Sequence, residues 1–95
     1  MPKESFDFVH ERLVLILRPN PEALLAEMVA PVRPGGLFAV EDIDEVSWLC
    51  YPPHPAWDTL LGVFQTIFRQ DGVDSFMGRW LPRLLQAAGL GDVRV

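Results

Sequence analysis

The sequence contains a single cysteine, Cys50, so no disulfide bond can form within one chain. This cysteine usage is typical of proteins in a reducing compartment, and we expect the cytoplasm. The sequence does not open with a basic segment followed by an apolar one, so a secretory signal is not predicted. No apolar run approaches 18 residues, and the sequence therefore predicts no membrane-spanning helix.

Basic residues are also scarce, because eight lysines and arginines stand against 13 aspartates and glutamates, for a net charge of −5. Nucleic acids and anionic membrane surfaces are bound by basic patches, and we expect neither as a partner. The two histidines, His10 and His54, and the lone cysteine do not show the spacing of metal ligands. The sequence therefore predicts no metal site.

Apolar residues, by contrast, are abundant for the size of the chain. Of the 95 residues, 49% are hydrophobic and 11% are aromatic. This length predicts one domain, and a domain so small buries only about 60–65% of its unfolded surface. The excess apolar surface predicts either a helix-rich core or burial against a partner subunit, so we expect a homo-oligomer.

The stretch from Arg33 to Asp44 is the part of the sequence around which the predicted architecture is arranged. Its proline and two glycines predict a tight turn, in which Gly35 adopts a positive φ. The apolar run that follows predicts a strand over 37–42 that is covered on both faces. Glu41, Asp42 and Asp44 then lie at the carboxyl end of this strand, where open α/β sheets bind their ligands.

Before this stretch, the sequence predicts a strand over 6–10, a turn over 13–17 and a helix over 21–30. Asn20 is a helix cap, and Pro21 suits the first helical position. Residues 6–42 thus predict a strand, a helix and a parallel strand joined by a right-handed crossover.

The chain after it predicts a loop over 43–56, helices over 57–70 and 78–88, and a short strand over 92–95. Prolines dominate the loop and exclude a regular element there. We expect His54 to be a solvated loop residue, Cys50 a small buried side chain and Trp57 a core residue. Pro82 is tolerable only in the first turn of its helix.

Four segments of the chain carry a family resemblance: 6–12 (FDFVHER), 21–28 (PEALLAEM), 33–42 (RPGGLFAVED) and 78–90 (GRWLPRLLQAAGL), with Asp92-Val93 after the last. Together they resemble the second half of a class I S-adenosylmethionine-dependent methyltransferase. The subset resembled is the small-molecule type 11 group related to quinone-biosynthesis methyltransferases. The resemblance implies an α/β fold with strands four, five and six of a partial Rossmann-like methyltransferase sheet.

Parts of that family's pattern are missing here. The Gly-rich loop that lets the backbone approach the cofactor does not occur, and neither strand seven nor the acidic residue that would hold the ribose is found. The chain is therefore expected to be about half of a catalytic domain, the acceptor-binding half. S-adenosylmethionine is implied as the cofactor, with weak or no binding to this chain alone, and enzyme activity of the isolated chain is not expected.

The resemblance places His10, Glu11 and Arg12 beside the methionine part of the cofactor. Glu41 and Asp42 are the candidates to orient a small-molecule methyl acceptor or remove its proton, with Asp44 beside them. Trp48 and Tyr51 are the candidates for an apolar acceptor pocket. Each of these groups has a plainer interpretation, as a solvated strand end, an acidic rim or core aromatics.

Two other functions fit the sequence. One is a non-enzymatic homodimeric interaction module derived from a methyltransferase, since two parallel strands have open edges and the helices after residue 57 carry more apolar residues than two strands can cover. The other is a ligand-binding protein without chemistry, which depends only on Trp48 and Tyr51. The sequence names neither the methyl acceptor nor the atom methylated.

Overall fold

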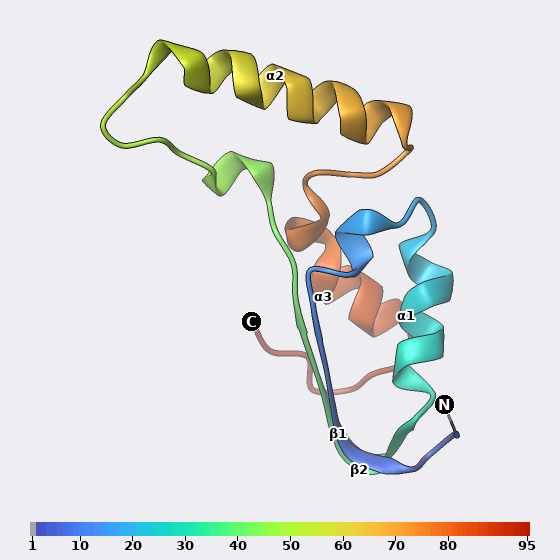
Figure 1. The fold of residues 1–95 in the computed structure, drawn as a ribbon. Coiled ribbons are helices and arrows are strands. Elements are labelled where there is room, and N and C mark those ends of the chain that lie inside the picture. The colour runs from blue at the N-terminus through green and yellow to red at the C-terminus, as the bar shows by residue number, and fades with distance from the viewer. Residues whose placement is uncertain (1) are drawn as a thin grey trace.

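The computed structural model describes residues 2–95, which form two strands, three α-helices and two short 3₁₀ helices (Figure 1). The predicted α/β class is confirmed. In chain order the elements are β1 (Phe6–Arg12), η1 (Leu15–Leu17), α1 (Pro21–Val29), β2 (Val32–Glu41), η2 (Glu45–Ser47), α2 (Pro55–Gln70) and α3 (Met77–Ala87). No helix within residues 2–95 combines the length and the apolar character needed to cross a membrane.

β1 and β2 pair in parallel, which confirms the predicted parallel arrangement of the two strands. Their register runs from Phe6 beside Val32, through Phe8 beside Leu37, to Arg12 beside Glu41. Between the first two pairs β2 has an irregularity that contains the proline–diglycine bend, so β2 begins well before the predicted residue 37. Gly35 has the expected positive φ of 80°. β1 extends two residues beyond the predicted end at residue 10.

The core occupies one face of this small sheet. Five apolar residues are buried there, and α1 and α3 cover them (Figure 1). Phe38 and Val40 of β2 pack against this cluster, whereas Phe8 and Leu37 on the opposite face are exposed. The prediction of a strand covered on both faces is therefore wrong for this chain. The core residues are Leu15, Ile16, Leu25, Met77 and Leu85.

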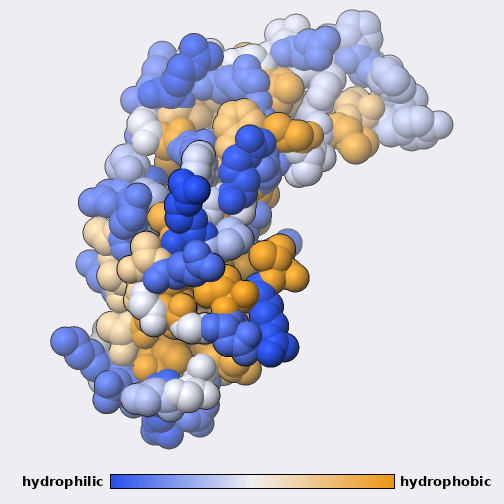
Figure 2. Space-filling view, turned by 180° about the vertical axis from the view of Figure 1, so that it is seen from behind, coloured by the Kyte–Doolittle hydropathy of each residue, from blue (hydrophilic) through white to orange (hydrophobic). Residues whose placement is uncertain are grey.

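Helix α2 stands apart from the rest of the molecule, at the top of Figure 1. It buries none of its residues completely. The molecule measures 50 × 26 × 20 Å, with a radius of gyration of 15.8 Å. A compact domain of this length would have a radius of gyration of about 12–13 Å. The chain is therefore elongated, and apolar patches appear both on its body and toward its upper end (Figure 2).

Several element boundaries differ from the sequence predictions. α2 begins at Pro55, two residues before the predicted start, because the ring of His54 accepts a hydrogen bond from the Ala56 N–H (3.0 Å) and caps the helix. Asn20 precedes α1 but makes no side-chain capping bond. η2 forms inside the predicted loop, and Pro82 is the sixth residue of α3, beyond its first turn.

The predicted strand over 92–95 is wrong, because this segment is irregular in the structure. Asp92 has a φ of 51°, which breaks the extended backbone that a strand requires. The Arg94 guanidinium donates to the Asp92 carboxylate at 3.0 Å, so the two side chains of this segment pair with each other. The sheet therefore has two strands within residues 2–95.

Candidate functional site

The predicted site residues lie at the carboxyl ends of the two strands, but they divide between the two faces of the sheet. Successive side chains of a strand point to opposite faces. Accordingly Glu11 is buried, whereas His10 and Arg12 on either side of it are exposed. Glu41 is exposed in the same way, beside Arg12 in the register, while Asp42 is partly buried. The five residues thus form an inner carboxylate pair and an outer group.

The inner pair, Glu11 and Asp42, holds the turn that follows β1. Oε1 of Glu11 accepts hydrogen bonds from the backbone N–H groups of Val14 (2.6 Å) and Leu15 (3.1 Å). Oδ2 of Asp42 accepts from the Ile16 N–H at 3.0 Å. These bonds support a strained turn, because Leu13 has a φ of 58°, in the left-handed region that side chains rarely adopt.

Both inner carboxyl groups have raised pKa values. Desolvation by burial is the main cause in each case, because it disfavours the charged form. The backbone hydrogen bonds lower the pKa of each group in part, and the charge of Asp42 raises the pKa of Glu11 further. The second carboxylate oxygen of Glu11, Oε2, is buried and has no hydrogen-bond partner. The pair therefore fixes the local backbone, with Glu11 buried and Asp42 partly buried.

The outer group places a histidine beside a carboxylate. The Nε2 atom of His10 lies 2.9 Å from Oε1 of Glu41, and both side chains are exposed. The ring of Phe8 stacks near the imidazole, with 6.4 Å between the ring centroids. A carboxylate that orients an imidazole is a common arrangement for accepting a proton from a hydroxyl group. Of the predicted residues, His10 and Glu41 are thus the pair that solvent or a ligand can reach.

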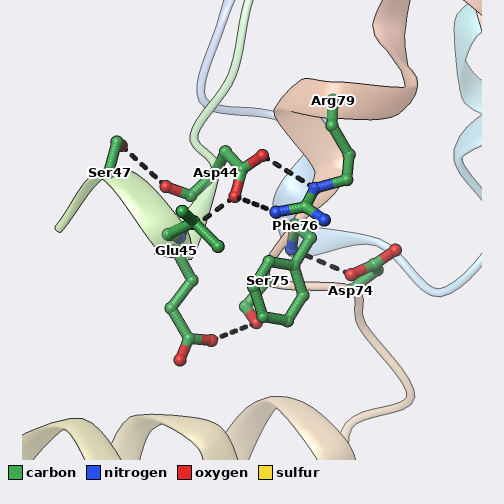
Figure 3. Close-up of polar contacts among 8 residues, drawn as sticks. Asp44, Glu45, Ser47, Asp74, Ser75, Phe76 and Arg79 are labelled. Atoms are coloured by element: carbon green, nitrogen blue, oxygen red, sulfur yellow. Dashed lines mark hydrogen bonds and ion pairs between the residues drawn. The ribbon is translucent and has the colours of Figure 1, made fainter.

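Asp44 lies in a separate cluster that connects the end of β2 to α3 (Figure 3). Its two carboxylate oxygens accept hydrogen bonds from Nε and Nη2 of Arg79 at 2.8 and 3.0 Å, and these bonds hold the pKa of Asp44 below its usual range. The same side chain accepts from the Val46 N–H at 3.0 Å and so caps η2. This geometry gives Asp44 a role in joining two elements.

The neighbouring Glu45 is buried and ties the same region to α2. Its carboxylate accepts hydrogen bonds from the hydroxyl of Ser75 and the side-chain amide of Gln65. Its backbone N–H donates to the Ser75 carbonyl at 2.9 Å. Sequence reasoning did not single out this residue, since an acidic residue in a loop is usually solvated. The clasp, as we call Asp44, Glu45, Gln65, Ser75 and Arg79, anchors both ends of the chain segment that carries α2.

The two aromatic candidates for an acceptor pocket are placed differently from each other. Trp48 packs against α2, with its ring centroid 5.9 Å from that of Phe64 and 6.5 Å from that of Phe68. Tyr51 lies in the loop and is 89% exposed. Cys50 is half-buried nearby. The structure thus gives Trp48 a packing role and does not bring it together with Tyr51.

A groove of about 330 Å³ lies elsewhere, between the start of α1 and α3. Trp80 forms part of its wall, and Arg18 and Arg83 are the cations that line it. The guanidinium of Arg83 lies over the Trp80 ring, 5.5 Å from its centroid. The sequence could have indicated that Trp80 and Arg83 lie together, because residues three apart on a helix share a face. Within residues 2–95, no three His, Cys, Asp or Glu side chains are grouped as metal ligands.

Comparison with known proteins gives a partial match. No protein-family model matches the chain. The methyltransferase str3 of Strobilurus tenacellus is 46% identical to it over 43 residues, which are 45% of this chain and 16% of that protein. The chain therefore corresponds to much less than two thirds of this relative. Over that part of its length, the chain is related to a methyltransferase.

Proposed function

We propose that this chain is the acceptor-side part of an S-adenosylmethionine-dependent methyltransferase that acts on a small molecule, of the type 11, quinone-biosynthesis-like group. The observation that carries the proposal is the parallel β1–α1–β2 crossover, with polar residues at the carboxyl ends of both strands, in a chain related to a methyltransferase. In open α/β sheets this edge is where ligands bind.

The residues present do not enclose a cofactor by themselves. His10 and Arg12 are exposed at the end of β1, and the unpaired Oε2 of Glu11 is covered by protein rather than directed at a ligand. The sequence lacks the glycines that would let the backbone approach the cofactor after a first strand. In a complete domain S-adenosylmethionine would supply the methyl group. The isolated chain should bind it weakly or not at all and should be inactive.

The proposed contribution of this chain to the reaction is to position the acceptor and receive its proton. His10 and Glu41 suit this role, because the carboxylate lies 2.9 Å from the imidazole and both are open to a ligand. Proton removal by a positioned base contributes about 10²–10⁴-fold to a rate. Asp42, the other predicted catalytic candidate, is engaged with the Ile16 and Ile43 N–H groups, which favours a structural role.

Two measurements test this proposal. Calorimetry of the isolated chain with S-adenosylmethionine should show no binding in the micromolar range, and a micromolar Kd would contradict the expected dependence on a missing cofactor loop. A chimera in which this chain replaces the part of the Strobilurus methyltransferase that contains the matched 43-residue segment should bind the cofactor. A chimera that is folded by circular dichroism, yet does not bind while its parent does, would refute the family assignment.

The acid–base role is tested in the same chimera. His10→Gln and Glu41→Gln should lower kcat for the relative's own acceptor by about 10²-fold or more, and Glu41→Gln, which is not expected beside the cofactor, should do so with an unchanged cofactor Kd. Asp7→Asn is the matched control, since Asp7 is an exposed acidic residue of the same strand, far from its carboxyl end. Equal activity of all three variants would exclude the pair from the chemistry.

A further inference from the structure

We propose that this chain forms a two-fold symmetric dimer in which α2 of each copy covers the open face of the β1–β2 sheet of the other. The first observation is the open face itself. Parallel strands are almost always covered on both faces, because their connections place helices there. Here α1 and α3 lie on one face, and Phe6, Phe8 and Leu37 are exposed on the other.

The second observation is that α2 presents an apolar stripe that its own chain leaves exposed. Its half-buried side, which includes Leu61, Gln65 and Phe68, follows the spacing of one helix face. Gln65 bonds to Glu45 and Phe68 lies near Trp48, so this side faces the clasp and the loop. A second row of large apolar residues lies beside it and is exposed, although one of them, Phe64, also contacts Trp48: Leu60, Val63, Phe64 and Ile67.

The open face of the sheet and the apolar stripe of α2 match in length and in apolar character. The 16 residues of α2 span about 24 Å, and the seven residues of β1 span about 23 Å. A helix with an apolar stripe is the element that covers a parallel sheet in α/β folds. Since each chain carries both the sheet face and the stripe, a two-fold axis satisfies both copies at once and leaves neither surface free.

The uncovered area is close to what a stable dimer buries. Seven large apolar side chains on the two surfaces are 40–68% exposed, and at about 180 Å² each they leave roughly 600 Å² open on every chain. A standard specific interface buries about 800 Å² per partner. His10 and Ala39 lie on the same sheet face and add to this area, so the dimer is proposed for the chain alone, not for a complete domain in which His10 meets an acceptor. Such patches on a monomeric protein mark an interaction surface.

Sedimentation analysis from 1 to 100 μM should show a dimer, with monomer appearing at the lower concentrations. Phe8→Lys on the sheet and Val63→Glu on α2 each place a charge inside the proposed interface, and each should raise the dimer Kd on the order of 100-fold. The double variant F8K/V63E should recover at least a tenfold part of the affinity lost, because the two surfaces that meet in the proposed dimer then carry opposite charges.

Leu49→Lys is the matched control, since Leu49 is an even more exposed apolar residue but lies in the loop, outside both surfaces. It should leave the dimer unchanged, and circular dichroism should show that all variants stay folded. A monomer at 100 μM, a dimer that Phe8→Lys and Val63→Glu do not weaken, or a double variant no better than the single ones would overturn the proposal. Cofactor affinity is a separate measurement, so failure here leaves the methyltransferase proposal untouched.

Discussion

The molecule has two regions that are built differently, although the same apolar residue types fill both. The body consists of β1, η1, α1, β2 and α3, and it contains all five buried core residues. The arm, residues 43–76, carries α2 and buries fully only the polar residues Glu45 and Ser75. Helix α2 is amphipathic and longer than α1, yet it packs on a loop rather than on the sheet. An apolar stripe thus predicts that a helix packs against another surface, but it does not identify that surface.

The largest expected effect comes from shortening a core leucine of the body. Leu25→Ala should lower the free energy of unfolding by about 2–5 kcal/mol, because Leu25 is 1% exposed and its loss leaves a cavity. Leu60→Ala in the arm should cost less than about 1 kcal/mol, because Leu60 is already 47% exposed. Urea unfolding at a low protein concentration, where the proposed dimer is dissociated, measures both. Equal costs would show that α2 is packed in solution.

A pair of glycines makes the second comparison. Gly36→Ala should destabilise the body by about 1–3 kcal/mol, since the new Cβ would meet the Asp7 carbonyl at 2.8 Å and the Arg33 carbonyl at 2.9 Å. Gly62→Ala in α2 should stabilise the arm by up to about 1 kcal/mol, because the new methyl group meets nothing within 4 Å and alanine favours a helix.

Hydrogen exchange separates these two glycine effects, since Gly36→Ala should speed exchange throughout the body and Gly62→Ala should slow it in α2 alone. A tolerated Gly36→Ala would mean that the bend does not lie against β1 in solution. Unchanged α2 exchange in Gly62→Ala would mean that the helix opens only together with the body.

The body is also the region that local sequence rules predict best. Gly35 is predicted to need a positive φ, and it has one, because few other residues tolerate the bend within β2. Gly89 ends α3 with a positive φ for the same reason, as Gly72 does for α2 in the arm. The parallel pairing follows from the length of the connection between two apolar strands. These features depend on a few neighbouring residues, so the sequence carries them.

The site was harder to predict, because it depends on which face each side chain takes. Neighbours in the sequence, such as Glu11 and His10, were grouped as one cluster, yet alternation along the strand separates them. Glu45 was not singled out, since its partners Gln65 and Ser75 lie 20 and 30 residues away. The strand predicted at 92–95 failed for a local reason, since Asp92 takes a positive φ and pairs with Arg94.

The smallest expected effect is the pH dependence of the free energy of unfolding. Its sign differs between a carboxyl group of the body and one of the arm. Burial raises the pKa of Glu11 in the body above its ordinary value of 4.5, so this group favours the folded state below that pH, and its contribution is lost as the pH rises through the raised pKa. Arg79 lowers the pKa of Asp44 in the arm, so that contribution is present above pH 3.8 and is lost as the pH falls through the lowered pKa.

Glu11→Gln should therefore flatten the fall in unfolding free energy between pH 4.5 and 7, because the carboxamide oxygen can still accept from Val14 and Leu15 without a buried charge. We expect it to stay within about 1 kcal/mol of the wild type at pH 7, whereas Glu11→Ala should cost about 1–3 kcal/mol by leaving both N–H groups unpaired. Asp44→Asn should change the slope only in the acid range. Urea unfolding at several pH values measures all three, and an unchanged slope in Glu11→Gln would mean that this carboxyl group is solvated rather than buried at the turn.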